Sequence, residues 1–289
     1  MALGVVILNY LNYSCTIECV ESVLRQHDVE TRIAVVDNGS PNDSADRLAA
    51  FCAGVPNAEF IANAENLGFA KGNNVGIAVL RRQGIDRILV LNSDIVLTDD
   101  TLAGTLSRMD VPDNVGVVGF RTENAEGRNS TPRNVTVRSG VTIFRDIYTT
   151  LGGFKNKYIT SRPIVSTVRK AVAQHDDSPR ILNPNSETLH GAALLFTENF
   201  FRDYDGFYPG TFLYYEEDCL SILCQKTGLR EMYCPAYRVL HKERGSAKMA
   251  WSKDAEEIQR QRQIESRAVA QRLAKMSATQ VREAFRFDR

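Results

Sequence analysis

The first hundred residues alternate between short apolar runs and segments in which apolar residues recur at helical spacing. Residues 4–8, 33–36 and 88–91 are continuous apolar runs of strand length, and residues 59–62 form a further candidate strand. Such runs are typical of strands that are covered on both faces. Residues 71–83 instead place apolar residues three and four positions apart, as an amphipathic helix does. Repeated strand–helix units predict right-handed crossovers and a parallel central sheet, so we expect an α/β fold.

The pattern loosens after residue 94. Residues 115–120 and 192–196 are two further candidate strands, whereas residues 121–138 are polar and typical of a loop. Residues 141–177 mix a candidate helix with basic residues and carry no clear motif. Residues 253–289 contain almost no Gly or Pro, which favours a helical C-terminal extension.

Charge and cysteine usage exclude several classes of protein. The chain has 289 residues with 35 Lys and Arg against 35 Asp and Glu, a net charge of zero. A general nucleic-acid binder normally carries an excess of basic residues, so we expect no nucleic-acid partner. No apolar run is long enough to cross a bilayer, and no basic leader precedes the first one. The six cysteines form no CxxC pair, which favours reduced thiols over a zinc site and indicates a cytoplasmic protein.

Three polar clusters follow the predicted strands directly. Asn9 and Tyr10 follow the first strand, residues 37–40 the second, and residues 92–94 the fourth. In open parallel sheets, ligands bind beyond the carboxyl ends of the strands, so these clusters are predicted to share one crevice. The alternative is that Asn, Asp, Gly and Ser serve only as turn formers here.

Seven short motifs resemble the family 2 glycosyltransferases of GT-A fold, with the closest similarity to bacterial rhamnosyltransferase-like members. In order along the chain, they are residues 5–10, 36–40, 66–76, 91–94, 191–193, 212–218 and His241. The resemblance covers about residues 5–246 and leaves the C-terminal tail uncovered. It implies a Rossmann-like, mostly parallel central sheet that is flanked by helices, followed by the helical C-terminal extension.

The resemblance also implies a division of the chain. Residues 1–252 would form the glycosyltransferase domain, with residues 1–120 as the nucleotide-binding half. Residues 121–252 would form the acceptor-binding and catalytic half, and residues 253–289 the extension.

The resemblance implies a nucleotide-sugar site on the first half. Asp37 would accept a hydrogen bond from the imide N–H of a uracil or thymine ring, and it could also cap a turn. Lys71 follows Gly68 at a helix entrance, where it would meet a phosphate; the alternative is a solvated helix lysine. The residues expected to bind the donor are Asn9, Tyr10, Asp37, Asn38, Asn66, Gly68, Lys71, Asn92, Ser93 and Asp94.

A divalent metal is implied at Asn92-Ser93-Asp94, the position that the family usually fills with Asp-x-Asp. Because Asn replaces the first acid, Asp94 would be the main carboxylate ligand, and His241 would complete the site. Mg²⁺ and Mn²⁺ are hard ions that suit carboxylate oxygens and substrate phosphates. By chemistry alone, a single His is more often structural.

The general base is expected in the acidic run Glu216-Glu217-Asp218, which follows an aromatic stretch. The resemblance places the base at Glu217 and leaves Glu216 and Asp218 as alternatives. Repulsion between neighbouring acids tends to raise a carboxyl pKa towards values useful for a base. The competing interpretation is a solvated helix start that the helix dipole stabilises.

The function that the resemblance implies is inverting transfer from a nucleoside diphosphate sugar, either dTDP-rhamnose or a UDP-sugar. The acceptor would be a glycan or a lipid-linked saccharide in bacterial surface polysaccharide synthesis. Its recognition would fall to residues 121–138 and to aromatic residues that a core could equally use, namely Phe207, Tyr208, Phe212 and Tyr214.

Two other classes remain as alternatives. A nucleotide-sugar-binding or scaffold protein with weak or no catalysis would keep the base pocket and lose the metal or the general base. A nucleotidyltransferase would need a Gly-rich basic loop after the first strand, and residues 9–12 supply none.

The C-terminal tail has a thin apolar stripe formed by Ile258, Val269, Leu273 and Met276. Such a helix could dock on the inner face of a membrane, pack on the catalytic domain, or form a homo-oligomer. Packing or self-association is the interpretation that we favour.

Overall fold

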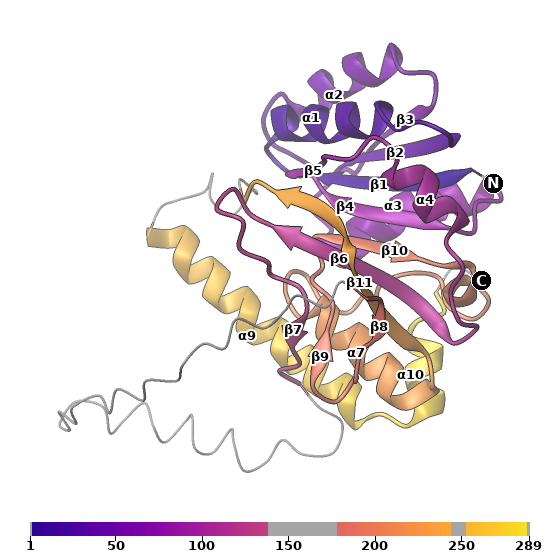
Figure 1. Ribbon diagram of the computed structural model, residues 1–289. Helices are drawn as coiled ribbons and strands as arrows, with labels where there is room; N and C mark the ends of the chain where they lie inside the picture. The colour runs from indigo at the N-terminus through magenta and orange to yellow at the C-terminus, as the bar shows by residue number, and fades with distance from the viewer. Residues whose placement is uncertain (1, 138–177, 244–252, 288–289) are drawn as a thin grey trace, which may run out of the picture.

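The computed structural model describes residues 2–137, 178–243 and 253–287 (Figure 1). The predicted alternation is present in its first part. The elements there are β1 (Leu3–Asn9), α1 (Tyr13–Leu24), β2 (Thr31–Asp37), α2 (Ser44–Ala53), β3 (Ala58–Ala62), α3 (Phe69–Arg82) and β4 (Ile88–Asn92). The expectation for residues 141–177 lies outside the described residues.

The second part of the chain has shorter strands and the C-terminal helices. Its elements are β5 (Ile95–Leu97), α4 (Leu102–Arg108), β6 (Val115–Glu123), β7 (Arg133–Asn134), β8 (Arg180–Ile181), β9 (Glu187–Thr188), β10 (Ala193–Phe196), α6 (Glu198–Phe201), α7 (Glu216–Thr227), β11 (Arg230–His241), α9 (Lys253–Lys275) and α10 (Ala278–Ala284). No helix in the described ranges has the length and apolar character that a bilayer crossing requires.

A single central sheet joins both parts in the order β3-β2-β1-β4-β10-β6-β11-β5. Strands β3, β2, β1 and β4 are parallel, as predicted. β10 is antiparallel to both of its neighbours, β4 and β6, while β11 runs parallel to β6 and antiparallel to β5. The predicted α/β fold with a helix-flanked central sheet is therefore confirmed.

Helices cover both faces of the sheet because the side chains of its strands alternate between two apolar clusters (Figure 1). Val5 and Ile7 of β1 lie in the cluster that includes α1, α2 and α4. Val6 lies in the other cluster, with residues of α3, α6 and α7. Continuous apolar runs follow directly from this two-sided burial. All six cysteines are buried and form no disulfide bond with one another.

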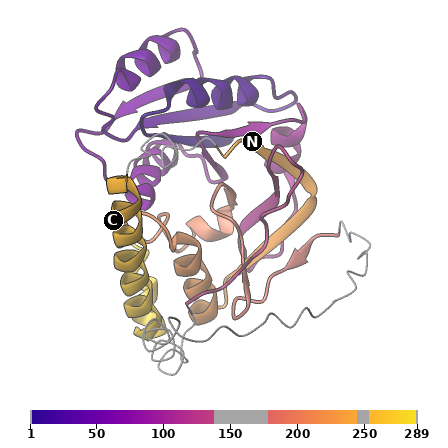
Figure 2. The ribbon, with the colours of Figure 1, turned by 90° about the vertical axis from the view of Figure 1, so that its left-hand side faces the viewer.

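The C-terminal helices belong to the second of these clusters. Leu273 of α9, Val281 of α10 and the neighbouring Phe285 are fully buried there. Figure 2 shows α9 as the long helix at the edge of the molecule, and its side chains contact α7. Of the apolar stripe of the tail, Leu273 is buried and Met276 packs partly against this cluster, whereas Ile258 is exposed.

Strand β6 is longer than predicted, because it continues to Glu123 into the polar segment that was expected to be a loop. Its last three residues pair with residues 238–240 of β11. The side chains of Arg121 and Glu123 form an ion pair with each other. Because this part of the strand carries paired charged residues, it lacks the apolar periodicity from which a strand is predicted.

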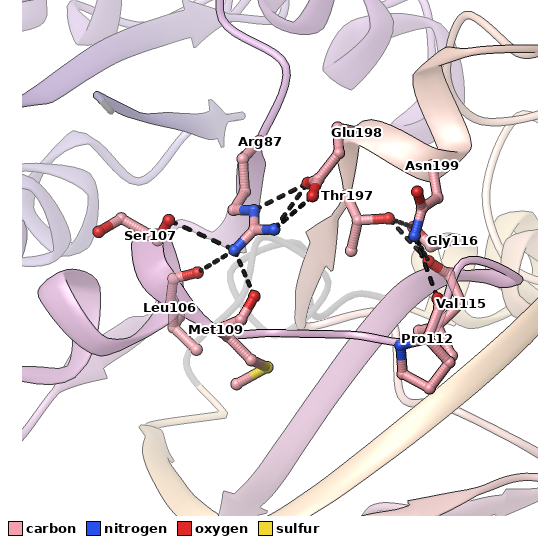
Figure 3. A network of polar contacts seen from close by, with 10 residues as sticks. All are labelled: Arg87, Leu106, Ser107, Met109, Pro112, Val115, Gly116, Thr197, Glu198 and Asn199. Atoms are coloured by element: carbon pink, nitrogen blue, oxygen red, sulfur yellow. Dashed lines mark hydrogen bonds and ion pairs between the residues drawn. The ribbon is translucent and has the colours of Figure 1, made fainter.

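The side chain of Arg87 links the first part of the chain to the second. Arg87, directly before β4, forms an ion pair with Glu198 of α6, with 2.6 Å between Nη2 and Oε1. The same guanidinium donates to the carbonyls of Leu106, Ser107 and Met109 at the end of α4 (Figure 3). A planar guanidinium with several donors suits this role.

Candidate active site

A cavity of about 690 Å³ opens beyond the carboxyl ends of the first strands. It is lined by Leu8, Tyr10, Leu11, Asn38, Asn66, Gly68, Phe69, Asn92, Ser93, Asp94, Phe212, Leu213, Tyr214, Ile258, Gln259 and Arg262. The three polar clusters that follow the strands thus meet at one cavity. The parallel registers explain this, because Leu8 pairs with Asn92 and Asn9 pairs with Asp37.

Asn9 and Asp37 lie beneath the cavity surface and bind each other. Both are buried, and Asn9 Nδ2 donates to Asp37 Oδ1 at 2.7 Å. Ser40 donates its hydroxyl to Asp37 Oδ1 at 2.7 Å and its backbone N–H to Oδ2 at 3.0 Å. Asp37 therefore caps this turn, and its role towards a nucleotide base stays a prediction.

Asn38 and Asn66 line the cavity and fix the loop before α3. Asn38 Nδ2 donates to Asn66 Oδ1 at 2.9 Å and to the Gly68 carbonyl at 3.1 Å. Asn38 Oδ1 accepts from the backbone of Leu67. These bonds hold the entrance of α3 against the end of β2.

Gly68 precedes α3 at a point of close backbone approach. Its φ is +83°, a conformation that favours glycine, and a Cβ there would lie 2.3 Å from the Phe212 carbonyl oxygen. The same carbonyl accepts from Phe69 N–H at 2.6 Å, so the first backbone N–H of α3 already has a hydrogen-bond partner. Lys71, by contrast, is exposed on α3 and does not line the cavity.

Asp94 and His241 form a close pair at the cavity. The distance from His241 Nε2 to Asp94 Oδ1 is 3.3 Å. The backbone produces this contact, because His241 pairs with Ile95 in register and Lys242 N–H donates to the Asp94 carbonyl at 3.0 Å. The structure thus brings together the two residues that were predicted to bind a metal.

The oxygen atoms around Asp94 fit a hard divalent cation. Asp94 Oδ2 and Asn92 Oδ1 are buried and have no hydrogen-bond partner within the described ranges. Carboxylate and amide oxygens together with an imidazole nitrogen are donors that Mg²⁺ or Mn²⁺ would accept, with substrate phosphate and water as further ligands. No cluster of three His, Cys, Asp or Glu ligands occurs among the described residues.

The three consecutive acids at the start of α7 point in different directions. Glu217 accepts on Oε1 from Gly191 N–H and from Arg133, both at 3.0 Å. Glu216 is buried in the interior. Asp218 accepts from the backbone N–H groups of Thr136 and Val137, both at 2.7 Å, and holds that loop.

Their surroundings separate the three acids further. Burial raises the pKa of Glu216 to about 8, and the adjacent Glu217 carboxylate adds to the effect. Burial also raises the pKa of Asp218, against the opposing effect of its hydrogen bonds from Val137 and Thr136. Of the three acids, Glu217 is the partly exposed one, and it contacts Gly191, the residue that follows His190.

Residues 4–171, more than half of the chain, match the family described as "Glycosyl transferase family 2". The chain belongs to glycosyl transferase family 2. No curated protein matches it.

Solved structures that share the fold of this family 2 chain are distant in sequence. GalNAc-T7 with UDP, GalNAc and Mn²⁺ has a TM-score of 0.57 and 12% identity, covering 85% of this chain and 44% of that one. The mannosyltransferase PcManGT of Pyrobaculum calidifontis, with GDP-Man and Mn²⁺, has a TM-score of 0.53 and 16% identity, covering 86% and 59%. TarS 1–349 of S. aureus, with UDP, has a TM-score of 0.52 and 13% identity, covering 85% and 59%. The chain thus spans about half the length of these proteins.

His190 is a site residue of this family 2 chain that the sequence did not reveal. Its ring centroid lies 5.7 Å from that of His241, and its Nδ1 accepts from Ala192 N–H at 3.1 Å. Burial lowers its pKa to about 4, while the Glu217 carboxylate acts in the opposite direction. The available signal was its place directly before the Gly191-Ala192-Ala193 motif.

The aromatic residues of this family 2 chain divide between core and cavity. Phe207 is fully buried against Phe196, with 5.0 Å between the ring centroids, and is a core residue. Phe212 and Tyr214 line the cavity instead. Tyr214 and Tyr215 both have positive φ, at 73° and 70°. Such strain costs energy in non-glycine residues and is concentrated at functional sites.

Proposed function

We propose that this family 2 chain is an inverting glycosyltransferase that uses a nucleoside diphosphate sugar and a divalent cation. The observation that carries the proposal is a chain of contacts between separate segments: Asp94 lies 3.3 Å from His241, and the His241 ring lies 5.7 Å from that of His190. Gly191, the next residue, donates its N–H to Glu217 at 3.0 Å. The solved structures of similar fold hold UDP or GDP-Man, two of them with Mn²⁺, which supports a nucleotide-sugar donor.

Glu217 is the proposed general base. Within the described ranges, both hydrogen bonds to this carboxylate end on Oε1, which leaves Oε2 for the acceptor hydroxyl. As the hydroxyl oxygen bonds to the anomeric carbon, its proton passes to Glu217. The bond from that carbon to the diphosphate oxygen breaks on the opposite side, and its electron pair leaves with the nucleoside diphosphate. The sugar is therefore inverted at the anomeric carbon.

Asp94 and His241 would hold the cation, with Asn92 Oδ1 nearby. When bound, the ion neutralises charge on the departing diphosphate. Asn38, Asn66 and the Gly68 loop would form the wall against which the nucleotide lies.

The finer assignment follows the sequence resemblance. The donor is dTDP-rhamnose or a UDP-sugar, and the acceptor is a glycan or a lipid-linked saccharide in bacterial surface polysaccharide synthesis. Phe212 and Tyr214 offer aromatic faces to a sugar ring at the cavity wall.

The test is incubation with dTDP-rhamnose, UDP-sugars and GDP-mannose, with and without Mn²⁺, and with oligosaccharide acceptors. We expect one donor to release its nucleoside diphosphate in an acceptor-stimulated reaction. Binding without release would favour a catalytically inactive binding or scaffold protein. Release of pyrophosphate on supplying a nucleoside triphosphate and a sugar phosphate would indicate a nucleotidyltransferase, and neither binding nor release would overturn the proposal.

A further inference from the structure

The first turns of α9 form part of the wall of the donor cavity. Ile258, Gln259 and Arg262 line it together with residues of the nucleotide-binding half. Gln259 Nε2 donates to the Tyr214 hydroxyl at 2.5 Å. The Arg262 guanidinium carbon lies 4.1 Å from the centroid of the Phe212 ring. Two independent contacts therefore hold this part of the helix against the cavity.

The other end of α9 fixes the helix to the domain. Ala270 and Leu273 are fully buried in the core cluster that includes α7. Since a helix is stiff over this length, its buried half sets the position of its first turns.

Among the residues that the structure describes, the lining of the cavity carries one charged side chain of each sign. Within the described part of the chain, Arg262 is the one cationic side chain in the lining, and Asp94 is the one acidic side chain. Lys71, the expected phosphate ligand, lies outside this lining. A nucleoside diphosphate brings several negative charges into the cavity, and arginine binds phosphate oxygens through two parallel N–H donors.

The Arg262 guanidinium is available for such a ligand. Its Nη1 lies 3.2 Å from Glu265 Oε2, three residues further along the same helix, and both side chains are exposed. Exposed ion pairs of this kind contribute little to the stability of a protein. That contact engages Nη1 alone. The contact with the face of the Phe212 ring holds the guanidinium at the cavity wall, where its other N–H groups can donate to a ligand.

We propose that Arg262 of the C-terminal helix binds the diphosphate of the donor nucleotide. The inference rests on the proposed function and adds to it a ligand-binding residue from beyond residues 4–171, the segment that matches the family. The negative charge of the donor would then be shared between the cation at Asp94 and a helix that follows the catalytic segments in sequence.

Calorimetric titration of the full chain with UDP, dTDP and GDP, each with Mn²⁺ and without acceptor, tests this. We expect Arg262→Met to weaken the Kd of the bound nucleotide about 10- to 100-fold, as the loss of a charged hydrogen bond implies. The Met side chain still covers Phe212. Arg262→Lys should retain much of the affinity. Arg260→Met removes an exposed charge from the same helix outside the cavity and should leave the Kd unchanged.

The outcomes separate the two proposals. If the wild-type chain binds none of the three nucleotides, the proposed function fails. If it binds one of them and Arg262→Met binds equally well, the function stands and the assignment of Arg262 is overturned. An equal loss of nucleotide affinity in Arg260→Met would also overturn it, because the effect would then come from the net charge of the helix and not from a contact with the ligand. A raised KM for the acceptor with unchanged nucleotide affinity would place the phosphate contact on the acceptor and overturn the donor assignment.

Discussion

His241 Nε2 lies 3.3 Å from Asp94 Oδ1 because His241, the last residue of β11, pairs with Ile95 of the antiparallel strand β5, and Asp94 directly precedes that strand. This pairing forms the edge of the sheet, and it is the last one in the order of strands. The contact between the two side chains thus depends on the backbone pairing of β11 with β5 at the edge of the sheet.

Removal of the cation should abolish most of the activity, and its return should restore it. We expect Asp94→Asn to raise the Mn²⁺ concentration for half-maximal turnover by roughly tenfold or more, because one charged ligand oxygen is lost. A Mn²⁺ titration of nucleoside diphosphate release measures this. Asp110→Asn, an exposed control, should behave as wild type. Full turnover after exhaustive chelation would contradict the metal assignment.

Replacement of the general base should reduce turnover and spare binding. Glu217→Gln keeps the shape and can still accept from Gly191 N–H, but it cannot take a proton. We expect kcat to fall about 10²- to 10⁴-fold, with an unchanged Kd for the nucleotide. Glu126→Gln is the exposed control. Near-normal kcat in Glu217→Gln would remove this residue from the role.

Gly68 should be far less tolerant of a methyl group than another glycine of similar conformation. Gly68 and Gly84 have φ of +83° and +78°, but a Cβ meets Phe212 only at Gly68 and meets nothing within 4 Å at Gly84. Both alanine variants should lose about 1 kcal/mol of stability from backbone strain. Only Gly68→Ala should also displace Phe212 and weaken nucleotide binding. Denaturant unfolding and nucleotide titration check the two effects, and equal behaviour of the variants would refute the contact.

Stability should fall as the pH rises towards 8. Burial raises the pKa of Glu231 from its ordinary value of 4.5 to about 8, and its Oε2 has no hydrogen-bond partner in the described ranges. Between these two values, the folded state binds the proton and the unfolded state releases it, so the free energy of unfolding decreases with rising pH. The slope from this group is at most about 1.4 kcal/mol per pH unit.

Glu231→Gln should reduce this slope, because the amide is neutral throughout, while buried Glu216, whose pKa is also raised to about 8, continues to contribute. Urea unfolding of both proteins at pH 5, 6, 7 and 8 measures the two slopes. Wild type and variant with parallel slopes would show that Glu231 does not titrate in this window.

The local sequence pattern was sufficient to predict those strands whose residues are apolar throughout. The apolar runs of β1, β2 and β4 are buried on both faces, so each strand could be recognised without its neighbours. The convergence of Asn38 and Asp94 also followed, because parallel strands end at the same edge. The closeness of His241 to Asp94 came from the family resemblance and not from any local pattern.

The remaining features depend on contacts between distant segments. Consecutive residues of a helix project about 100° apart, so the sequence could not tell which of Glu216, Glu217 and Asp218 faces the site. His190 lies in no periodic element, and its role appears only beside His241. The position of Arg262 depends on how the far end of α9 packs, which no pattern within that helix encodes.

The family match ends at residue 171, whereas the cavity wall is completed by residues 258–262. The enclosure of the ligand and the chemistry at Asp94 therefore belong to different stretches of the gene. Substitutions at Ile258, Gln259 or Arg262 can reshape the cavity without altering the bonds that hold Asp94 or Glu217. Under the proposed function, changes confined to this one helix would therefore alter which donor the cavity accepts.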